Sequence, residues 1–268
     1  MNHKNMKNGI KAIVKKTAKN LGFKIVRERG DADKTREIAE QVQKLPDADL
    51  YCPVFSPWLG KRFQSYCLAS LPYTLVSPDR LWVLHSLARQ TLALDGDFVE
   101  CGVYKGGTAL LFAKILGEQT PPHTKKLHLF DTFQGMPEVN AEKDIHRKGD
   151  FSDTSLETVR ARLAAFPWAI FHPGILPATF SAIAESRICL AHVDVDIYEA
   201  VLNCCDRLYP KLVPGGVMVF DDYGFESCPG AREAVDQWFS DKPEVPLVLP
   251  TGQALVTRLP GYVDSASK

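Results

Sequence analysis

The sequence predicts an α/β protein whose sheet is mostly parallel and has seven strands. From residue 97 onward, short apolar runs alternate with stretches of helical periodicity. These runs are mostly apolar, as expected for strands that helices cover on both faces. Acidic residues and glycines follow directly after these runs, at the edge where open parallel sheets bind ligands.

The elements follow in order along the chain. A helix begins at Ser77-Pro78-Asp79, which supplies an N-cap hydroxyl, a proline at the first helical position and an acid in the first turn. The predicted strands cover residues 97–101, 126–131, 168–172, 188–193, 217–220, 246–249 and 253–258. The predicted helices between them cover residues 107–117, 155–165, 198–208 and 229–240. The last two strands are close in sequence, so we expect an antiparallel C-terminal strand.

Two segments precede this α/β domain, which we place at residues 77–268. Residues 1–30 form a basic arm with nine Lys or Arg and one acid, Glu28, and residues 9–21 have the pattern of an amphipathic helix. One interpretation is that residues 1–22 contact a membrane surface or another anionic partner. The other is that the helix packs its apolar stripe against the rest of the protein or against a second subunit. Residues 31–76 mix prolines with aromatic residues, which is typical of a helical and irregular cap over a core.

The composition excludes several classes of protein. With 45% hydrophobic and 24% charged residues, the 268-residue chain is neither mostly disordered nor collagen-like, and no run of about 18 apolar residues exists to span a bilayer. The chain is neutral and its arm carries +8, so the rest carries −8 and is a poor partner for nucleic acid. Seven cysteines without a CxxC pair predict reduced thiols in a cytoplasmic protein that has no secretory signal.

The first strand leads into a glycine-rich turn that runs from Glu100 through Gly102 to Gly106-Gly107. Its glycines let a ligand approach the backbone, and the next helix offers free N–H groups. The spacing is not the dinucleotide GxGxxG pattern, and Glu100 suits a cationic ligand or a ligand amine. A tight turn alone also explains the glycines. Asp131 ends the second strand, where an acid can accept both hydroxyls of a ribose; a helix cap or a solvated turn is the alternative.

Four carboxylates follow two further strands: Asp194, Asp196, Asp221 and Asp222. If the strands are neighbours, the carboxylates converge and require a cation to neutralise them. Oxygen ligands without Cys or His favour Mg²⁺, Ca²⁺ or Mn²⁺ over zinc. The alternative is a set of helix N-caps, which is plausible for Asp196. We interpret His192, two residues before Asp194, as a packed strand histidine.

The chain resembles the macrocin O-methyltransferase family, class I S-adenosylmethionine-dependent and Mg²⁺-dependent enzymes that methylate sugar hydroxyls. The resemblance covers about residues 70–240, and its specific part is the combination DVDIYE, LYPKLVPGG and DDYG. The matching segments are LVSPDRLWVLHSLARQ (75–90), GDFVECGVYKGGT (96–108), LFDTFQGMPE (129–138), HVDVDIYEAVLNCCDRLYPKLVPGGVMVFDDYG (192–224) and AREAVDQWF (231–239).

The resemblance implies a Rossmann-like fold, a homodimer and a role for each matched residue. S-adenosylmethionine would be bound by Glu100, Gly102, Val103, Tyr104, Asp131, Asp150 and Ser152. Mg²⁺ would be bound by Asp194, Asp221 and Asp222, orienting a sugar diol for Asp196 as general base. The acceptor would be a glycosylated natural product, a glycolipid or a polysaccharide. Residues 173–180 depart from the family's pattern, since a Lys, a Trp and an acid are missing there, which concerns the acceptor rather than the cofactor.

Three other interpretations compete. A phosphatase would use Asp194 as nucleophile in a DxD arrangement, but it gives the Glu100 turn no purpose. A nicotinamide-dependent oxidoreductase needs a third glycine that the turn lacks. A non-enzymatic scaffold docked through the basic arm leaves four strand-end aspartates without a role.

Overall fold

A computed structural model of the chain describes residues 56–119 and 124–261. The described residues belong to one compact unit. The predicted arm at residues 1–30, the first part of the predicted cap at residues 31–55 and the membrane contact predicted for residues 1–22 lie outside the described residues. Within the described part of the chain, no helix is long and apolar enough to cross a membrane.

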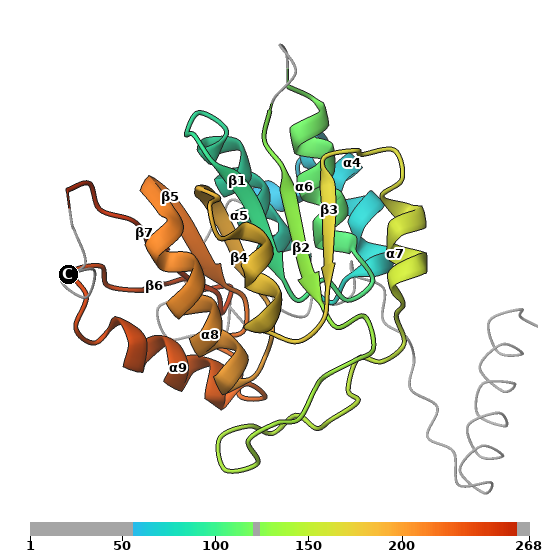
Figure 1. Cartoon of the computed structure of the whole chain (residues 1–268). Helices are drawn as coiled ribbons and strands as arrows, with labels where there is room; N and C mark the ends of the chain where they lie inside the picture. Colours follow the sequence, from blue (N-terminus) through green and yellow to red (C-terminus); the bar gives the residue numbers. More distant parts are fainter. Residues whose placement is uncertain (1–55, 120–123, 262–268) are drawn as a thin grey trace, which may run out of the picture. The chain divides into compact units, whose positions relative to one another are not determined.

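The centre of the fold is a seven-stranded sheet, which confirms the predicted fold class (Figure 1). Its spatial order is β3-β2-β1-β4-β5-β7-β6; β1 to β5 run parallel, and β7 pairs antiparallel with β5 and with β6. The strands are β1 (Asp97–Cys101), β2 (Leu127–Asp131), β3 (Ala169–Pro173), β4 (Ile188–Val193), β5 (Leu212–Phe220), β6 (Leu247–Val248) and β7 (Ala254–Thr257).

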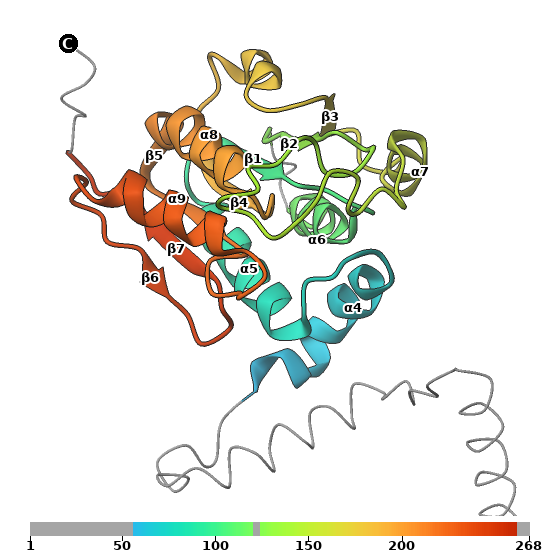
Figure 2. The same ribbon diagram turned by 90° about the horizontal axis from the view of Figure 1, so that it is seen from below.

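Helices cover both faces of the sheet (Figure 2). One hydrophobic core joins α4, α5 and α6 to one face, and a second core joins α8 and α9 to the other. This double cover explains why β4 is buried at every position. The helices are η1 (Pro57–Leu59), α4 (Lys61–Ser70), η2 (Leu71–Tyr73), α5 (Pro78–Thr91), α6 (Gly107–Gly117), α7 (Leu156–Arg162), η3 (Ala178–Ile183), α8 (Tyr198–Leu208), η4 (Tyr209–Lys211) and α9 (Pro229–Phe239).

Two details differ from the prediction. Strand β5 begins at Leu212, five residues before the predicted start, because Gly215 in a left-handed conformation (φ 81°) lets the strand pass a break in its register with β4. Helix α5 begins at Pro78 as predicted, but the Ser77 hydroxyl makes no cap bond to the backbone. It accepts instead from Nε of Arg80 at 3.1 Å, a contact that matters for the site below.

Candidate active site

A cavity of about 450 Å³ opens at the carboxyl ends of the parallel strands. Each strand from β1 to β5 contributes a residue at or just after its end: Gly102, Asp131, Gly174, Asp194 and Asp222. The parallel sheet therefore gathers at one edge most of the polar residues that the sequence analysis selected.

The glycine-rich turn lies against the end of β4. Gly102 has φ 86°, and a Cβ placed there would lie 1.7 Å from the carbonyl oxygen of Asp194, so only glycine fits. Asp131 holds the turn from the side, since its Oδ2 accepts from the backbone N–H of Val103 (2.7 Å) and of Tyr104 (2.9 Å). Its Oδ1 accepts from the N–H of Phe133 at 2.6 Å. Both carboxylate oxygens of Asp131 thus stabilise the backbone that lines the cavity.

The segment that contains Asp150 and Ser152, two of the residues expected to bind S-adenosylmethionine, lies beside the cavity, but neither of these two side chains lines it. Phe151 is the lining residue of this segment, whereas Asp150 and Ser152 do not line the cavity. Asp150 instead accepts from the N–H of Arg147 at 2.9 Å and contacts Nδ1 of His146 at 3.2 Å. Phe151 lies in a turn with a left-handed φ of 59°, and of these three residues only its ring lines the cavity.

Glu100, which was also expected to bind the cofactor, does not line the cavity either. Its side chain is fully buried, and Oε1 lies 3.1 Å from Nδ1 of His192, which is also fully buried. Nε2 of His192 lies 3.5 Å from Oδ1 of Asp221. Burial lowers the pKa of His192, but its bonds to Asp221 and Glu100 outweigh this and raise it to about 10. The predicted strand histidine is therefore a buried cation between two carboxylates, below the cavity floor.

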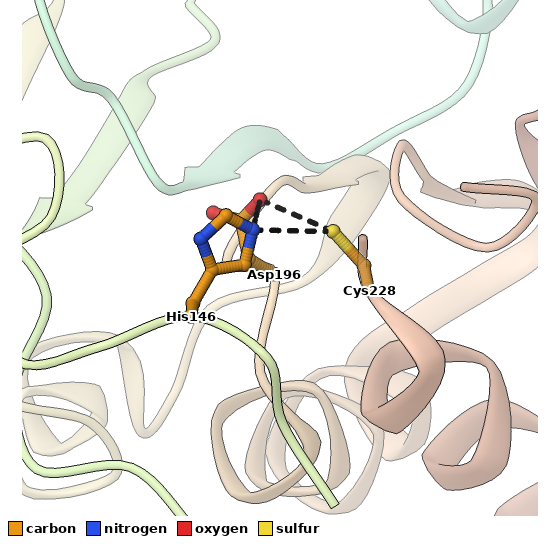
Figure 3. Close-up of side chains that lie close together, drawn as sticks. All are labelled: His146, Asp196 and Cys228. Atoms are coloured by element: carbon orange, nitrogen blue, oxygen red, sulfur yellow. Dashed lines mark hydrogen bonds and ion pairs between the residues drawn. The ribbon is translucent and has the colours of Figure 1, made fainter. Parts of the chain in front are cut away.

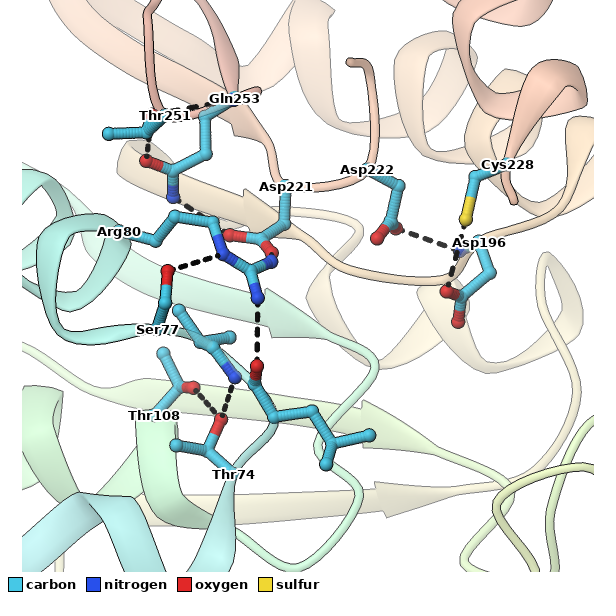
Figure 4. Close-up of polar contacts among 12 residues, drawn as sticks. Thr74, Ser77, Arg80, Thr108, Asp196, Asp221, Asp222, Cys228, Thr251 and Gln253 are labelled. Carbon is cyan, nitrogen blue, oxygen red and sulfur yellow. Dashed lines mark hydrogen bonds and ion pairs between the residues drawn. The ribbon is translucent and has the colours of Figure 1, made fainter. Parts of the chain in front are cut away.

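Arg80 brings a second cation to Asp221 (Figure 4). Its guanidinium pairs with Oδ2 of Asp221, donates to the carbonyl of Leu75 at 2.8 Å and lies 4.8 Å from the ring centre of Phe225. Oδ1 of Asp221 accepts from Gln253 at 2.8 Å. Burial raises the pKa of Asp221, but His192 and Arg80 outweigh it and lower the pKa below its ordinary value. Asp221 is fully buried and does not line the cavity.

The other three aspartates face the cavity, and their pKa values are raised. Burial is the first cause in each case; the next causes are Asp221 for Asp194, and Asp196 with Asp194 for Asp222. Asp222 points away from Asp221 and accepts from the N–H of Asp196 at 3.0 Å. Burial and the neighbouring carboxylates thus both disfavour the ionised form of these side chains.

The predicted metal triad is therefore only partly assembled. Among the described residues, two sets offer donor atoms within 4.8 Å of one another: His192 with Asp194 and Asp221, and His146 with Asp196 and Cys228. Asp194, Asp221 and Asp222 do not form such a set, because adjacent residues after β5 point in opposite directions.

Asp196 occupies a strained position at the start of the β4–α8 loop. Its φ is 60°, a left-handed conformation that is uncommon outside glycine and clusters at functional sites. Tyr104 and Phe151, with φ of 48° and 59°, share this conformation and also line the cavity. Oδ1 of Asp196 lies 3.7 Å from Nε2 of His146 and accepts from the thiol of Cys228 at 3.5 Å (Figure 3).

Three of these cavity residues were missed by the sequence analysis: Arg80, His146 and Cys228. Arg80 stands within a matched segment but lies on a helix before the first strand. His146 and Cys228 lie in loops without periodicity. Each of them matters because of a contact with a residue that is distant in sequence. Arg80 and Asp221 are 141 residues apart, and His146 and Cys228 are 82 residues apart, so no local sequence pattern predicts these contacts.

The sheet order, with its antiparallel end, and the glycine-rich turn at the end of β1 are those of a class I methyltransferase, an enzyme that uses S-adenosylmethionine as methyl donor. Within that class, the chain belongs to the macrocin-O-methyltransferase (TylF) family, whose model matches residues 19–246. Family membership confirms the resemblance and removes the phosphatase, oxidoreductase and scaffold interpretations.

Curated relatives have related activities. The chain is 30% identical over 182 residues to 8-demethyl-8-(2,3-dimethoxy-alpha-L-rhamnosyl)-tetracenomycin-C 4'-O-methyltransferase of Streptomyces olivaceus, covering 63% of this chain and 68% of the relative. It is 28% identical over 184 residues to mycinamicin III 3''-O-methyltransferase of Micromonospora griseorubida, covering 63% and 71%.

Solved structures agree on the fold. The O-methyltransferase NovP is 25% identical, with a TM-score of 0.61 over 70% of this chain and 82% of that one. The calicheamicin methyltransferase CalS11 is 20% identical, with a TM-score of 0.62 over 87% and 94%.

Proposed function

We propose that this enzyme transfers a methyl group from S-adenosylmethionine to a hydroxyl of a sugar carried by a glycosylated natural product. The observation that carries the proposal is a single cavity in which the Asp131-braced turn and three aspartates with raised pKa values face each other. The relatives' names support the acceptor class, since they describe methylation of rhamnosylated tetracenomycin and of mycinamicin III.

The cofactor would bind on the turn side of the cavity. Gly102, Val103 and Tyr104 offer backbone there, and Asp131 keeps that backbone in place while its remaining lone pairs accept ribose hydroxyls. When bound, S-adenosylmethionine supplies the electrophilic methyl group. Phe151 covers this side, and Asp150 acts indirectly through the loop that carries the ring. Glu100 acts from below as a positioning residue for His192.

The acidic side of the cavity suits a magnesium ion. Asp194 and Asp222 present carboxyl oxygens to the cavity, and oxygen donors of this kind suit a hard cation. Burial and then the neighbouring aspartates raise the pKa of both groups, and a bound cation would favour their ionised form. Asp221 would contribute an oxygen from below if it exchanged part of its contact with Arg80. A bound Mg²⁺ would lower the pKa of a coordinated sugar hydroxyl, although less than zinc does.

Asp196 is the residue we assign as general base. It lines the cavity, stands two residues beyond Asp194, and has its backbone fixed by the bond from its N–H to Asp222. Burial raises its pKa, which brings a carboxyl closer to the range in which it accepts a proton efficiently near neutral pH. A positioned base of this kind contributes about 10²–10⁴-fold to the rate.

The acceptor would enter past an apolar rim. Leu75 and Ile175 line the cavity and keep 65% and 60% of their surface exposed, so they are placed to contact an apolar aglycone. Ile175 belongs to residues 173–180, the segment that departs from the family's pattern. We therefore propose that this segment distinguishes the acceptor of this enzyme from those of its relatives.

Calorimetry with S-adenosylmethionine, followed by methyl transfer from labelled cofactor to a panel of rhamnosylated polyketides, tests the proposal. We expect cofactor binding without Mg²⁺ and transfer only with Mg²⁺. Matched acceptors that lack the hydroxyl next to the methylated one should react much more slowly if the ion orients a diol. Absence of cofactor binding, or equal rates in excess chelator, would overturn the proposal.

A further inference from the structure

Three potential metal ligands of different chemistry meet on one side of the cavity (Figure 3). His146 comes from the loop after β2, Asp196 from the loop after β4, and Cys228 from the residue before α9. Nε2 of His146 lies 3.6 Å from Sγ of Cys228 and 3.7 Å from Oδ1 of Asp196, and the sulfur lies 3.5 Å from that oxygen. The donor atoms thus form a nearly equilateral triangle.

The size of this triangle matches a tetrahedral metal site. Zinc binds sulfur at about 2.3 Å and nitrogen or carboxylate oxygen at about 2.0–2.1 Å. In a tetrahedron these bond lengths place the ligand atoms about 3.3–3.6 Å apart, so an ion fits above the triangle with shifts of a few tenths of an ångström. The fourth position would face the cavity, which all three residues line.

The histidine is already oriented for this role. Its Nδ1 lies 3.2 Å from Oδ2 of Asp150, and that carboxylate also accepts from the N–H of Arg147 at 2.9 Å. A carboxylate that holds one ring nitrogen leaves the other nitrogen to the metal, which is the usual arrangement around zinc-binding histidines. Asp150 does not line the cavity, and its contact with Nδ1 of His146 would give it the function of orienting the metal-binding histidine.

The thiol is also placed to ionise when a metal arrives. Cys228 is buried, with 3% of its surface exposed, and it precedes the N-terminus of α9, where the helix dipole favours an anion. Its Sγ donates to Oδ1 of Asp196 at 3.5 Å, so the proton that a metal ion would displace lies between two of the three donor atoms.

We propose that His146, Asp196 and Cys228 form a binding site for a divalent transition-metal ion of intermediate softness, and that Zn²⁺ is the ion it principally binds. Binding breaks the S–H bond of Cys228, releases that proton to solvent and forms a metal–sulfur bond; no electron is transferred. The nitrogen, oxygen and sulfur donors select Zn²⁺ or Co²⁺ over Mg²⁺. The oxygen donors of Asp194 and Asp222 make the opposite selection.

Occupation of this site would inhibit the enzyme. The metal would use Oδ1 of Asp196, the carboxylate assigned above as general base, so this consequence rests on the proposed function. The binding itself does not rest on it and is measured without substrate.

The test is a Co²⁺ titration of the full-length protein with excess Mg²⁺ present. We expect an absorption band from thiolate-to-cobalt charge transfer, which Zn²⁺ abolishes by competition. Cys228→Ser should remove the band and His146→Ala should weaken binding strongly, while Asp150→Asn should weaken it about 10–100-fold as an outer-sphere partner. Cys67→Ser on α4, away from the cavity lining, should leave the titration unchanged.

Inhibition by Zn²⁺ is measured in parallel with Mg²⁺ present, and each variant is compared with its own rate without added Zn²⁺. We expect the inhibitory Zn²⁺ concentration to rise together with the Co²⁺ dissociation constant in Cys228→Ser and His146→Ala. A Co²⁺ complex without the thiolate band, or the same affinity in folded Cys228→Ser and His146→Ala, would overturn the site. Thiolate binding of Co²⁺ without inhibition would keep the site and refute Asp196 as the base.

Discussion

Replacement of Gly102 by alanine tests how closely the glycine-rich turn is packed against β4. A Cβ at this position would lie 1.7 Å from the carbonyl oxygen and 2.6 Å from the carbonyl carbon of Asp194. Both atoms belong to backbone, so rotation of a side chain cannot relieve the contact. The ends of β1 and β4 would have to separate by more than 1 Å before the Cβ–oxygen distance reached even 3.0 Å, below which Cβ atoms are essentially never found.

The expected loss of stability has three parts. A non-glycine residue in the left-handed region costs about 1–2 kcal/mol. Overpacking in a dense interior costs about 1–3 kcal/mol. Separation of the strand ends breaks the bond from the N–H of Asp194 to the carbonyl of Cys101, now 2.8 Å long, which adds about 1 kcal/mol. We therefore expect Gly102→Ala to lower the free energy of unfolding by about 3–6 kcal/mol.

Gly149→Ala is the matched control. Gly149 has φ 88°, close to the 86° of Gly102, but a Cβ there would meet nothing within 4 Å. Its replacement should cost only the conformational term of about 1–2 kcal/mol. The assay is urea unfolding of both variants beside the parent, monitored by circular dichroism. Equal destabilisation of the two variants would refute the argument, because the close approach to Asp194 would then have no energetic effect.

Three further predictions concern the cofactor, the ion and pH. Asp131→Asn replaces an acceptor of backbone N–H groups with an amide, so S-adenosylmethionine should bind about 10-fold more weakly or worse by calorimetry, whereas the exposed control Asp206→Asn should bind normally; unchanged affinity in Asp131→Asn would exclude the bracing role. Asp222→Asn should abolish Mg²⁺-dependent turnover and leave cofactor affinity within about threefold; retained turnover would remove Asp222 from the metal site. Burial, followed by repulsion from His128, lowers the pKa of His172 in the folded protein to about 4, whereas the same side chain in the unfolded chain has an ordinary pKa near 6.5. Between pH 6.5 and pH 4 the unfolded chain therefore binds a proton that the folded protein does not, and the free energy of unfolding falls as the pH falls. His172→Gln should reduce the loss between pH 7 and pH 5 by about 1–2 kcal/mol, and parallel stability curves for parent and variant would show that His172 does not titrate in this way.

The architecture was predictable from the sequence alone, because secondary structure follows from local periodicity. The runs at 97–101 and 188–193 are short and carry apolar residues on both strand faces, and they became β1 and β4 with the predicted bounds. The carboxyl-end rule then placed Gly102, Asp131, Asp194 and Asp222 at one cavity before any distance was known. The length of β5 was underestimated, because Pro214-Gly215-Gly216 has a composition typical of a turn although the strand passes through it.

Which of these residues face the cavity and which lie beneath it depends on how the strands and loops pack. The register of Val193 with Phe220 sets Asp194 beside Asp221, and the pleat then directs Asp222 into the cavity while Asp221 lies between His192 and Arg80. The pairing of Glu100 with His192 depends on the neighbouring registers of β1 and β4. Contacts of this kind join residues that are distant along the chain, and a side chain's neighbours are fixed by how strands and loops pack, which local periodicity does not specify.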